Sequence, residues 1–194
     1  MVFARAPRLG TVKRRLARDI GALAAWRFHR DTTGALLRRL APDRRWTTWL
    51  AVTPDRWLWR PRGLWQQPLT GIAQGPGDLG QRMGRMLAVL PPGPVVIVGS
   101  DIPGIRDRHV AEAFSALGSH DWVLGPADDG GYWLIGARRR PTLRLPFEGV
   151  EWGSERAMAQ TRAGIGKASV ALLETLVDVD RGADLARQKG RPRL

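Results

Sequence analysis

The sequence of 194 residues contains no cysteine, which excludes disulfide bonds and thiolate metal sites and is typical of the reducing cytoplasm. No apolar run approaches the roughly 20 residues that a membrane-spanning helix needs, and residues 1–5 lack the pattern of a signal peptide. Hydrophobic residues make up 43% of the chain, which is ordinary for a globular protein. We therefore expect a cytoplasmic protein without a membrane span, folded as a single domain over residues 1–194, since domains commonly run about 100–200 residues.

Acidic residues are also scarce, and 31 Lys plus Arg against 18 Asp plus Glu give a net charge of +13. Such a charge could attract nucleic acid, anionic lipid or a phosphorylated small molecule. The arginines are dispersed in short clusters, which favours an ordinary solvated surface. Nine tryptophans could stack on bases, but several lie in predicted strands, where core packing is expected. Nucleic acid is therefore not expected as a partner.

Strand and helix patterns alternate along the chain. Apolar and β-branched runs predict strands, and apolar positions at helical spacing predict helices. Alternation of this kind predicts an α/β fold, a mostly parallel sheet with helices on both sides. The predicted strands are 2–5, 46–52, 95–98, 122–124, 132–137 and 170–177, and the helices are 12–40 with a break at 19–21, 78–90, 108–117, 154–163 and a terminal one, while 54–71 has no clear pattern.

Carboxylates follow three of the predicted strands. In open α/β sheets ligands bind beyond the carboxyl ends of the strands, so these side chains are candidates for one shared site. Mg²⁺ takes carboxylate oxygens together with substrate phosphates, which predicts a metal–phosphate site. Any one of these residues alone is better explained as a turn former. The acids are Asp101, Asp128, Asp129, Asp178 and Asp180.

The loop after the first strand is basic. Residues 8–15 place a glycine turn before a helix whose first turns carry Lys13 and Arg15. Cations at this end oppose the helix macrodipole and cost stability, so the placement indicates an anion there. The alternative is ordinary surface charge on an arginine-rich protein.

Residues 75–80 formally match the dinucleotide motif G-x-G-x-x-G, and Asp101 follows Gly80 by 21 residues. Residues 69–74 form a poor buried strand, and Asp78 would face the pyrophosphate. A nicotinamide-dependent enzyme is therefore kept only as a minor alternative.

Several motifs resemble the bacterial family DUF2064, which is grouped with glycosyltransferase-A and nucleotidyltransferase-like folds. Residues 5–16 resemble its K-x-P-x-x-G-x-V-K-T-R-L opening, and residues 74–83 resemble Q-G-x-G-D-L-G-x-R-M. Residues 99–103 resemble G-S-D-x-P, and residues 125–136 resemble G-P-A-x-D-G-G-Y-x-L-I-G. Arg14 departs from the usual threonine, and residues 181–184, which follow Asp180, depart from T-P-E-D.

The resemblance implies a Rossmann-like three-layer fold of the nucleotide-diphospho-sugar transferase type. It also implies that Asp101 and Asp180 bind a metal, Mg²⁺ or Mn²⁺, and that Gly130, Gly131 and Tyr132 face the acceptor. Asp129 is expected to orient or deprotonate an acceptor hydroxyl, with a turn cap as the alternative, and Lys13 is the second catalytic candidate. No histidine is assigned a metal role. The nucleotide- and phosphate-binding candidates are Arg5, Gly10, Lys13, Arg15, Gly77, Asp78 and Arg82.

These residues favour a metal-dependent transferase with a nucleotide-sugar donor. The same residues suit a nucleotidyltransferase that uses a nucleoside triphosphate and a phosphorylated acceptor, and sequence does not separate the two. A non-catalytic nucleotide-binding protein and a nucleic-acid-binding protein are weaker alternatives. The acceptor and the oligomeric state stay open.

Overall fold

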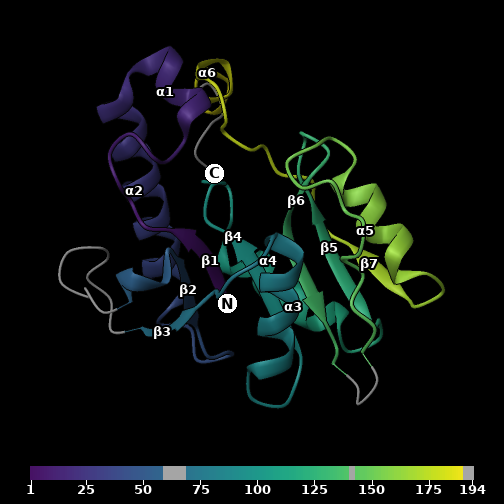
Figure 1. Cartoon of the computed structure of the whole chain (residues 1–194). Coiled ribbons are helices and arrows are strands. Elements are labelled where there is room, and N and C mark those ends of the chain that lie inside the picture. The colour runs from purple at the N-terminus through teal and green to yellow at the C-terminus, as the bar shows by residue number, and fades with distance from the viewer. Residues whose placement is uncertain (59–68, 140–142, 190–194) are drawn as a thin grey trace.

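A computed structural model describes residues 1–58, 69–139 and 143–189. Its strands form one seven-stranded sheet in the order β3-β2-β1-β4-β6-β5-β7 (Figure 1). Strand β6 is antiparallel to both neighbours, β4 and β5, and all other pairs are parallel. The mostly parallel sheet is confirmed. The strands are β1 (Val2–Arg5), β2 (Trp49–Thr53), β3 (Thr70–Ala73), β4 (Val95–Gly99), β5 (Trp122–Pro126), β6 (Tyr132–Ala137) and β7 (Val170–Leu172).

Helices cover both faces of this sheet. Leu37 of α2 and Val110 of α4 are buried in the core on one face, and Met86 of α3 and Ile165 of α5 are buried in the core on the other. The three-layer α/β architecture follows from these two cores. The helices are α1 (Arg14–Ile20), α2 (Ala22–Leu40), α3 (Leu79–Val89), α4 (Asp107–Ala116), α5 (Ala157–Ile165) and α6 (Gly182–Lys189), with a short 3₁₀ helix, η1, at Asp55–Trp57.

Strand β4 lies near the centre of the sheet and contacts both cores. Val96 and Val98 belong to the core under α2 and α4, whereas Val95 and Ile97 belong to the core under α3 and α5. All four side chains are buried. The continuous apolar run of this strand is therefore explained by burial on both faces, as the sequence predicts.

A third, smaller core joins α1, α2 and α6, which lie together at one end of the molecule (Figure 1). It contains Leu16, Ala25 and Val179, with Leu185 packed against it. The predicted helix break occurs at Gly21, whose φ of 86° favours glycine. This core holds the segment around Val179 against the start of α1.

Several elements differ in extent from the sequence predictions. Strand β2 begins at Trp49 rather than at Trp46. Strand β7 ends at Leu172, because the chain then leaves regular pairing and contacts β5 only through bonds such as Leu176 N–H to the Pro126 carbonyl. Helix α5 begins at Ala157 rather than near Ser154, whose hydroxyl accepts the N–H of Arg156. Strand β3 forms at the edge of the sheet, where its side chains are exposed or half-buried. Within 54–71, residues 59–68 lie outside the described part of the chain.

Among the described residues, no helix is both long and apolar enough to cross a bilayer.

Candidate functional site

The strand order reverses between β1 and β4. The sheet grows from β1 through β2 to β3 on one side, and from β4 toward β7 on the other. Ligands of open α/β sheets bind at such a switch point, beyond the carboxyl ends of the strands. The loop after β1 leads to Lys13, and the loop after β4 begins with Ser100 and Asp101. The two loops that the sequence singled out therefore flank this point.

Lys13 is the residue around which the site is organised. It is the N-cap of α1, with a left-handed backbone (φ 45°, ψ 50°) that is uncommon for a residue other than glycine. Its side chain is only 3% exposed, and Nζ lies 3.4 Å from Asp101 Oδ2, 3.3 Å from Asp178 Oδ1 and 3.1 Å from Asp180 Oδ1. Burial opposes the charge, but the three carboxylates outweigh burial and raise the pKa of Lys13 above its usual value. Lys13 is a buried, permanently charged ammonium.

Asp101 lies at the end of β4, and its side chain is about half exposed. His29 of α2 bridges this carboxylate and the end of β1, with Nδ1 3.3 Å from Asp101 Oδ1 and Nε2 2.9 Å from the carbonyl oxygen of Arg5. Loss of solvent opposes ionisation of Asp101, but Lys13 and His29 together lower its pKa well below the usual range. The sequence analysis missed His29, because a single histidine within a helix has no motif that marks it.

The other two acids come from residues 178–182, which we call the acid turn. The N–H of Asp178 donates to Asp128 Oδ1 (3.0 Å), and the N–H of Asp180 donates to Asp184 Oδ2 (3.1 Å). The N–H of Gly182 donates to Asp19 Oδ2 at 2.8 Å. Three carboxylates from different segments thus fix the backbone of the acid turn.

The Asp184 carboxylate therefore accepts a hydrogen bond from the Asp180 N–H even though residues 181–184 depart from the family pattern. Asp178, which the sequence analysis did not include among the metal ligands, lies 3.3 Å from Lys13 Nζ, compared with 3.1 Å for Asp180. Burial is the main cause that raises the pKa of Asp178 to about 6, with further contributions from Asp101 and Asp180 against the opposing effect of Lys13.

Arg15 completes the charge balance of this cluster. Its Nη1 lies 3.1 Å from Asp180 Oδ2, and its side chain is 62% exposed. Three carboxylates face Lys13 and Arg15, so the cluster keeps one negative charge in excess. The sequence predicted an anion near Lys13 and Arg15 at the start of α1. In the structure, carboxylates of the chain itself are among the anions that these two residues contact.

The chemistry of the donor set suits a hard divalent cation, since three carboxylates converge on one point. Within the described residues, no group of three or more His, Cys, Asp or Glu side chains is arranged to hold a metal ion as it stands. The Lys13 ammonium lies within 3.4 Å of an oxygen of each of the three carboxylates.

The segment from Gly75 to Arg82 reaches the same edge of the sheet. Gln74, which is buried, donates from Nε2 to the carbonyl oxygens of Ala4 and Ala51, near the ends of β1 and β2. Gly77 has a φ of 98°, and Asp78 forms a capping box with Gln81 at the start of α3. The Asp78 carboxylate therefore has a structural partner, which agrees with discounting the dinucleotide motif.

Arg82 follows one turn later, and its Nε is buried without a hydrogen-bond partner within the described chain. Arg5 is exposed at the end of β1, and Gly10 (φ 77°) lies in the exposed turn that follows. No hydrogen bond or ion pair joins these three residues to Lys13 within the described chain.

The predicted acceptor residues form a tight turn between β5 and β6. Asp129 Oδ1 accepts the N–H of Gly131 at 2.9 Å, so this carboxylate closes its own turn. Gly130 has a φ of 84° and packs against the backbone of Glu155. The hydroxyl of Tyr132 accepts a hydrogen bond from Thr161 at 3.5 Å, and burial raises the pKa of Tyr132. The turn is joined to the acid turn through Asp128, next to Asp129.

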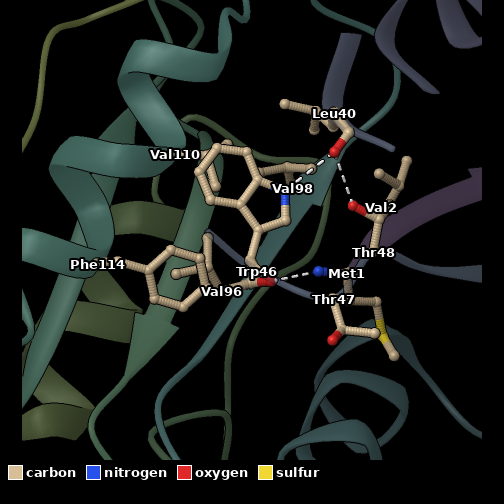
Figure 2. A pocket seen from close by; sticks show the side chains of 10 residues that line it. All are labelled: Met1, Val2, Leu40, Trp46, Thr47, Thr48, Val96, Val98, Val110 and Phe114. Carbon is tan, nitrogen blue, oxygen red and sulfur yellow. Dashed lines mark hydrogen bonds between the residues drawn. The ribbon is translucent and has the colours of Figure 1, made fainter. Parts of the chain in front are cut away.

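Two hollows in the described part of the chain lie elsewhere. One is a cavity of about 20 Å³, room for one water molecule, at the amino ends of the central strands. Figure 2 shows the side chains that line it, among them Met1, Trp46 and Val96. The indole of Trp46 donates to the carbonyl oxygen of Leu40 (Figure 2). A second hollow of about 450 Å³ borders α3 and Arg139, beyond the end of the antiparallel β6. Both hollows lie on the side of the sheet where the parallel strands begin, whereas Lys13 lies beyond the carboxyl ends of these strands. Neither hollow is therefore the candidate site.

Comparison with solved structures places this fold among nucleotide-diphospho-sugar transferases and nucleotidyltransferases. A protein of Desulfovibrio desulfuricans G20, provisionally named a nucleotide-diphospho-sugar transferase, is 29% identical with a TM-score of 0.86 over 99% of this chain and 87% of that one. CMP:2-keto-3-deoxy-manno-octonic acid synthetase in complex with CTP is 12% identical with a TM-score of 0.58 over 97% and 95% of the two chains. Rv0371c of Mycobacterium tuberculosis H37Rv in complex with manganese is 15% identical with a TM-score of 0.51 over 96% and 95%. The last two likenesses concern the fold alone.

The chain belongs to the family described as uncharacterized protein conserved in bacteria (DUF2064), whose profile matches residues 36–154. The resemblance inferred from the sequence motifs is thereby confirmed. The matched range contains Asp101 and the turn of Asp129, whereas Lys13 and the acid turn lie outside it. No curated protein sequence matches this chain.

Proposed function

We propose that this protein is a metal-dependent transferase that uses a nucleotide-sugar donor. The observation that carries the proposal is the meeting of Lys13 with Asp101, Asp178 and Asp180 at the switch point of the sheet. A buried cation among acids from two strand ends is suited to neutralise diphosphate charge in concert with a metal ion.

Asp101, Asp178 and Asp180 would hold Mg²⁺ or Mn²⁺. When bound, such an ion supplies positive charge that bridges phosphate oxygens and stabilises a leaving nucleoside diphosphate. Lys13 and the exposed Arg15 bind the phosphates from the start of α1, where backbone N–H groups also face the ligand. Arg5 and Gly10, on the same loop, border this phosphate site.

The nucleoside lies against the start of α3 in this proposal. Gly77 and Asp78 shape the turn there, and Arg82 offers a buried Nε–H that has no partner in the described chain. The acceptor approaches from the turn of Gly130, Gly131 and Tyr132. Asp129 orients an acceptor hydroxyl through Oδ2, while Oδ1 keeps the N–H of Gly131.

Nucleotidyl transfer is the second candidate, and one observation favours it: the fold is shared with a synthetase that was solved in complex with CTP. In that reaction Lys13 stabilises charge on the α-phosphate while a phosphorylated acceptor attacks in line. The leaving group distinguishes the two reactions. A sugar donor leaves a nucleoside diphosphate, whereas a triphosphate donor releases pyrophosphate.

A thermal-shift screen of nucleoside triphosphates and nucleotide-sugars, each with Mg²⁺, Mn²⁺ or EDTA, tests the proposal. A ligand at 100 times its dissociation constant stabilises the native state by about 2.7 kcal/mol. We expect a metal-dependent shift with a nucleotide-sugar, and a shift with triphosphates alone would instead support nucleotidyl transfer. Asp101→Ala is expected to abolish the metal-dependent shift, and Lys13→Ala to weaken nucleotide affinity. No shift with any nucleotide would refute both reactions.

A further inference from the structure

The position of Lys13 raises a question that nucleotide binding alone does not answer. Its ammonium lies 3.1–3.4 Å from the three carboxylates that the proposed function assigns to a divalent cation. Mg²⁺ binds oxygen at about 2.0–2.1 Å and repels a neighbouring ammonium. An ion bound by all three carboxylates would therefore take the place of the Lys13 ammonium.

The surroundings explain why the ammonium lies there. The acid turn is held by backbone hydrogen bonds to Asp128 and Asp184, so Asp178 and Asp180 stay in place whichever cation they face. Without a positive charge between them, three carboxylates would repel one another at close range. Lys13, whose side chain is 3% exposed, supplies that charge from a strained left-handed backbone position.

We propose that Lys13 is an exchangeable internal cation. Its ammonium neutralises Asp101, Asp178 and Asp180 until a divalent cation binds, and it then turns outward to the phosphates of the nucleotide. The inference rests on the proposed function for the identity of the two ligands. A lysine suits this exchange because its ammonium is a compact charge on a flexible four-carbon stem.

The exchange also accounts for the arrangement of the site. Within the described residues, no group of three or more His, Cys, Asp or Glu side chains is arranged to hold a metal ion, and the Lys13 ammonium lies between the three acids. Exposed Arg15, which contacts only Asp180 among the three acids, does not close the site and need not move. Metal binding is thereby coupled to delivery of a positive charge to the phosphate side.

The first test measures Mn²⁺ binding without nucleotide, by electron paramagnetic resonance of the free ion. Lys13→Met removes the competing charge, and we expect this variant to bind Mn²⁺ at least about tenfold more tightly than the wild type. The reason is that displacing a buried ammonium from three carboxylates costs more free energy than a tenfold change in affinity represents. Adding Asp180→Asn to this variant is expected to remove the gain. Lys167→Met, at an exposed position, is the matched control and is expected to leave Mn²⁺ affinity unchanged. Equal or weaker binding by folded Lys13→Met would overturn the exchange.

The second test uses the wild-type protein and decides the matter even where Lys13→Met does not fold. An amine-reactive reagent is applied with and without Mg²⁺, and labelling of Lys13 relative to exposed Lys167 is followed by mass spectrometry. We expect Lys13 to be protected without Mg²⁺ and to react several-fold faster with it. We take about 20 mM Mg²⁺ as an upper working concentration for weak sites. If the ratio of Lys13 to Lys167 labelling is unchanged up to this concentration, the exchange is overturned.

The two proposals fail in different ways. If the wild type binds nucleotide with metal but Lys13 stays protected, the exchange is wrong and the transferase proposal stands. If no nucleotide shifts the melting temperature while Mn²⁺ still releases Lys13, the transferase proposal is wrong and the cation exchange stands.

Discussion

Asp178→Asn provides a quantitative test of the electrostatics of this site. The Asp178 side chain is 18% exposed, and its Oδ1 accepts hydrogen bonds from Lys13 Nζ (3.3 Å) and from the N–H of Val179 (2.6 Å). Asparagine keeps an oxygen that can accept both bonds but carries no charge. The substitution therefore removes one carboxylate charge while leaving the hydrogen-bond pattern of the acid turn available.

The magnitude follows from the pKa of Asp178, which burial raises from 3.8 to about 6. Between these values the folded protein holds a proton that the unfolded chain has released, so the free energy of unfolding falls as the pH rises through this window. Above about pH 7 the full cost is present, and the difference between a pKa of 3.8 and one of about 6 corresponds to about 3 kcal/mol. We expect Asp178→Asn to be more stable than the wild type at pH 8 by up to this amount, and equally stable near pH 4.

Urea unfolding in EDTA, followed from pH 4 to pH 8, measures this difference. Asp31→Asn, which removes an exposed carboxylate from α2, is the control variant. With saturating Mg²⁺ the order is expected to reverse, because the wild type gains binding energy that the variant lacks. A variant that is less stable than the wild type in EDTA at pH 8, or that keeps the same slope between pH 4 and pH 6, would refute the electrostatic reasoning.

Three further substitutions test other parts of the structure. Gly130→Ala places a Cβ 2.2 Å from the backbone oxygen of Glu155, and we expect it to lower the free energy of unfolding in urea by more than about 2 kcal/mol. Gly149→Ala, also at positive φ but in open space, is the control and is expected to lower it by about 1 kcal/mol. His29→Leu removes the bridge to Asp101 and is expected to cost about 1–3 kcal/mol and weaken metal-dependent nucleotide binding, with partial recovery in His29→Gln. Asp184→Ala leaves two N–H groups of the acid turn without acceptors and is expected to cost about 0.5–2 kcal/mol by denaturation and to lower Mn²⁺ affinity in the Lys13→Met background.

The sheet was predictable because its signals are local. The apolar run of β4 indicates a strand that is buried on both faces. Strands β1 and β6 begin and end at the residues that the sequence predicts. Turn chemistry was equally local: Gly21 marks the break between α1 and α2. The end of β7 was not predictable, since apolar residues continue beyond Leu172, whereas regular pairing gives way there to an isolated parallel bridge between Ala127 and Leu176.

The sequence by itself determined that acids follow the strands and that a basic loop follows β1, and parallel strands bring their carboxyl ends to one edge. Only the tertiary structure decided which acids meet Lys13, because Asp178 lies 165 residues away along the chain and the direction of its side chain depends on the acid turn. His29 likewise reaches Asp101 only because α2 packs beside the ends of β1 and β4. Local preferences select strands and turns, whereas the partners of a charged side chain are fixed by packing between distant segments.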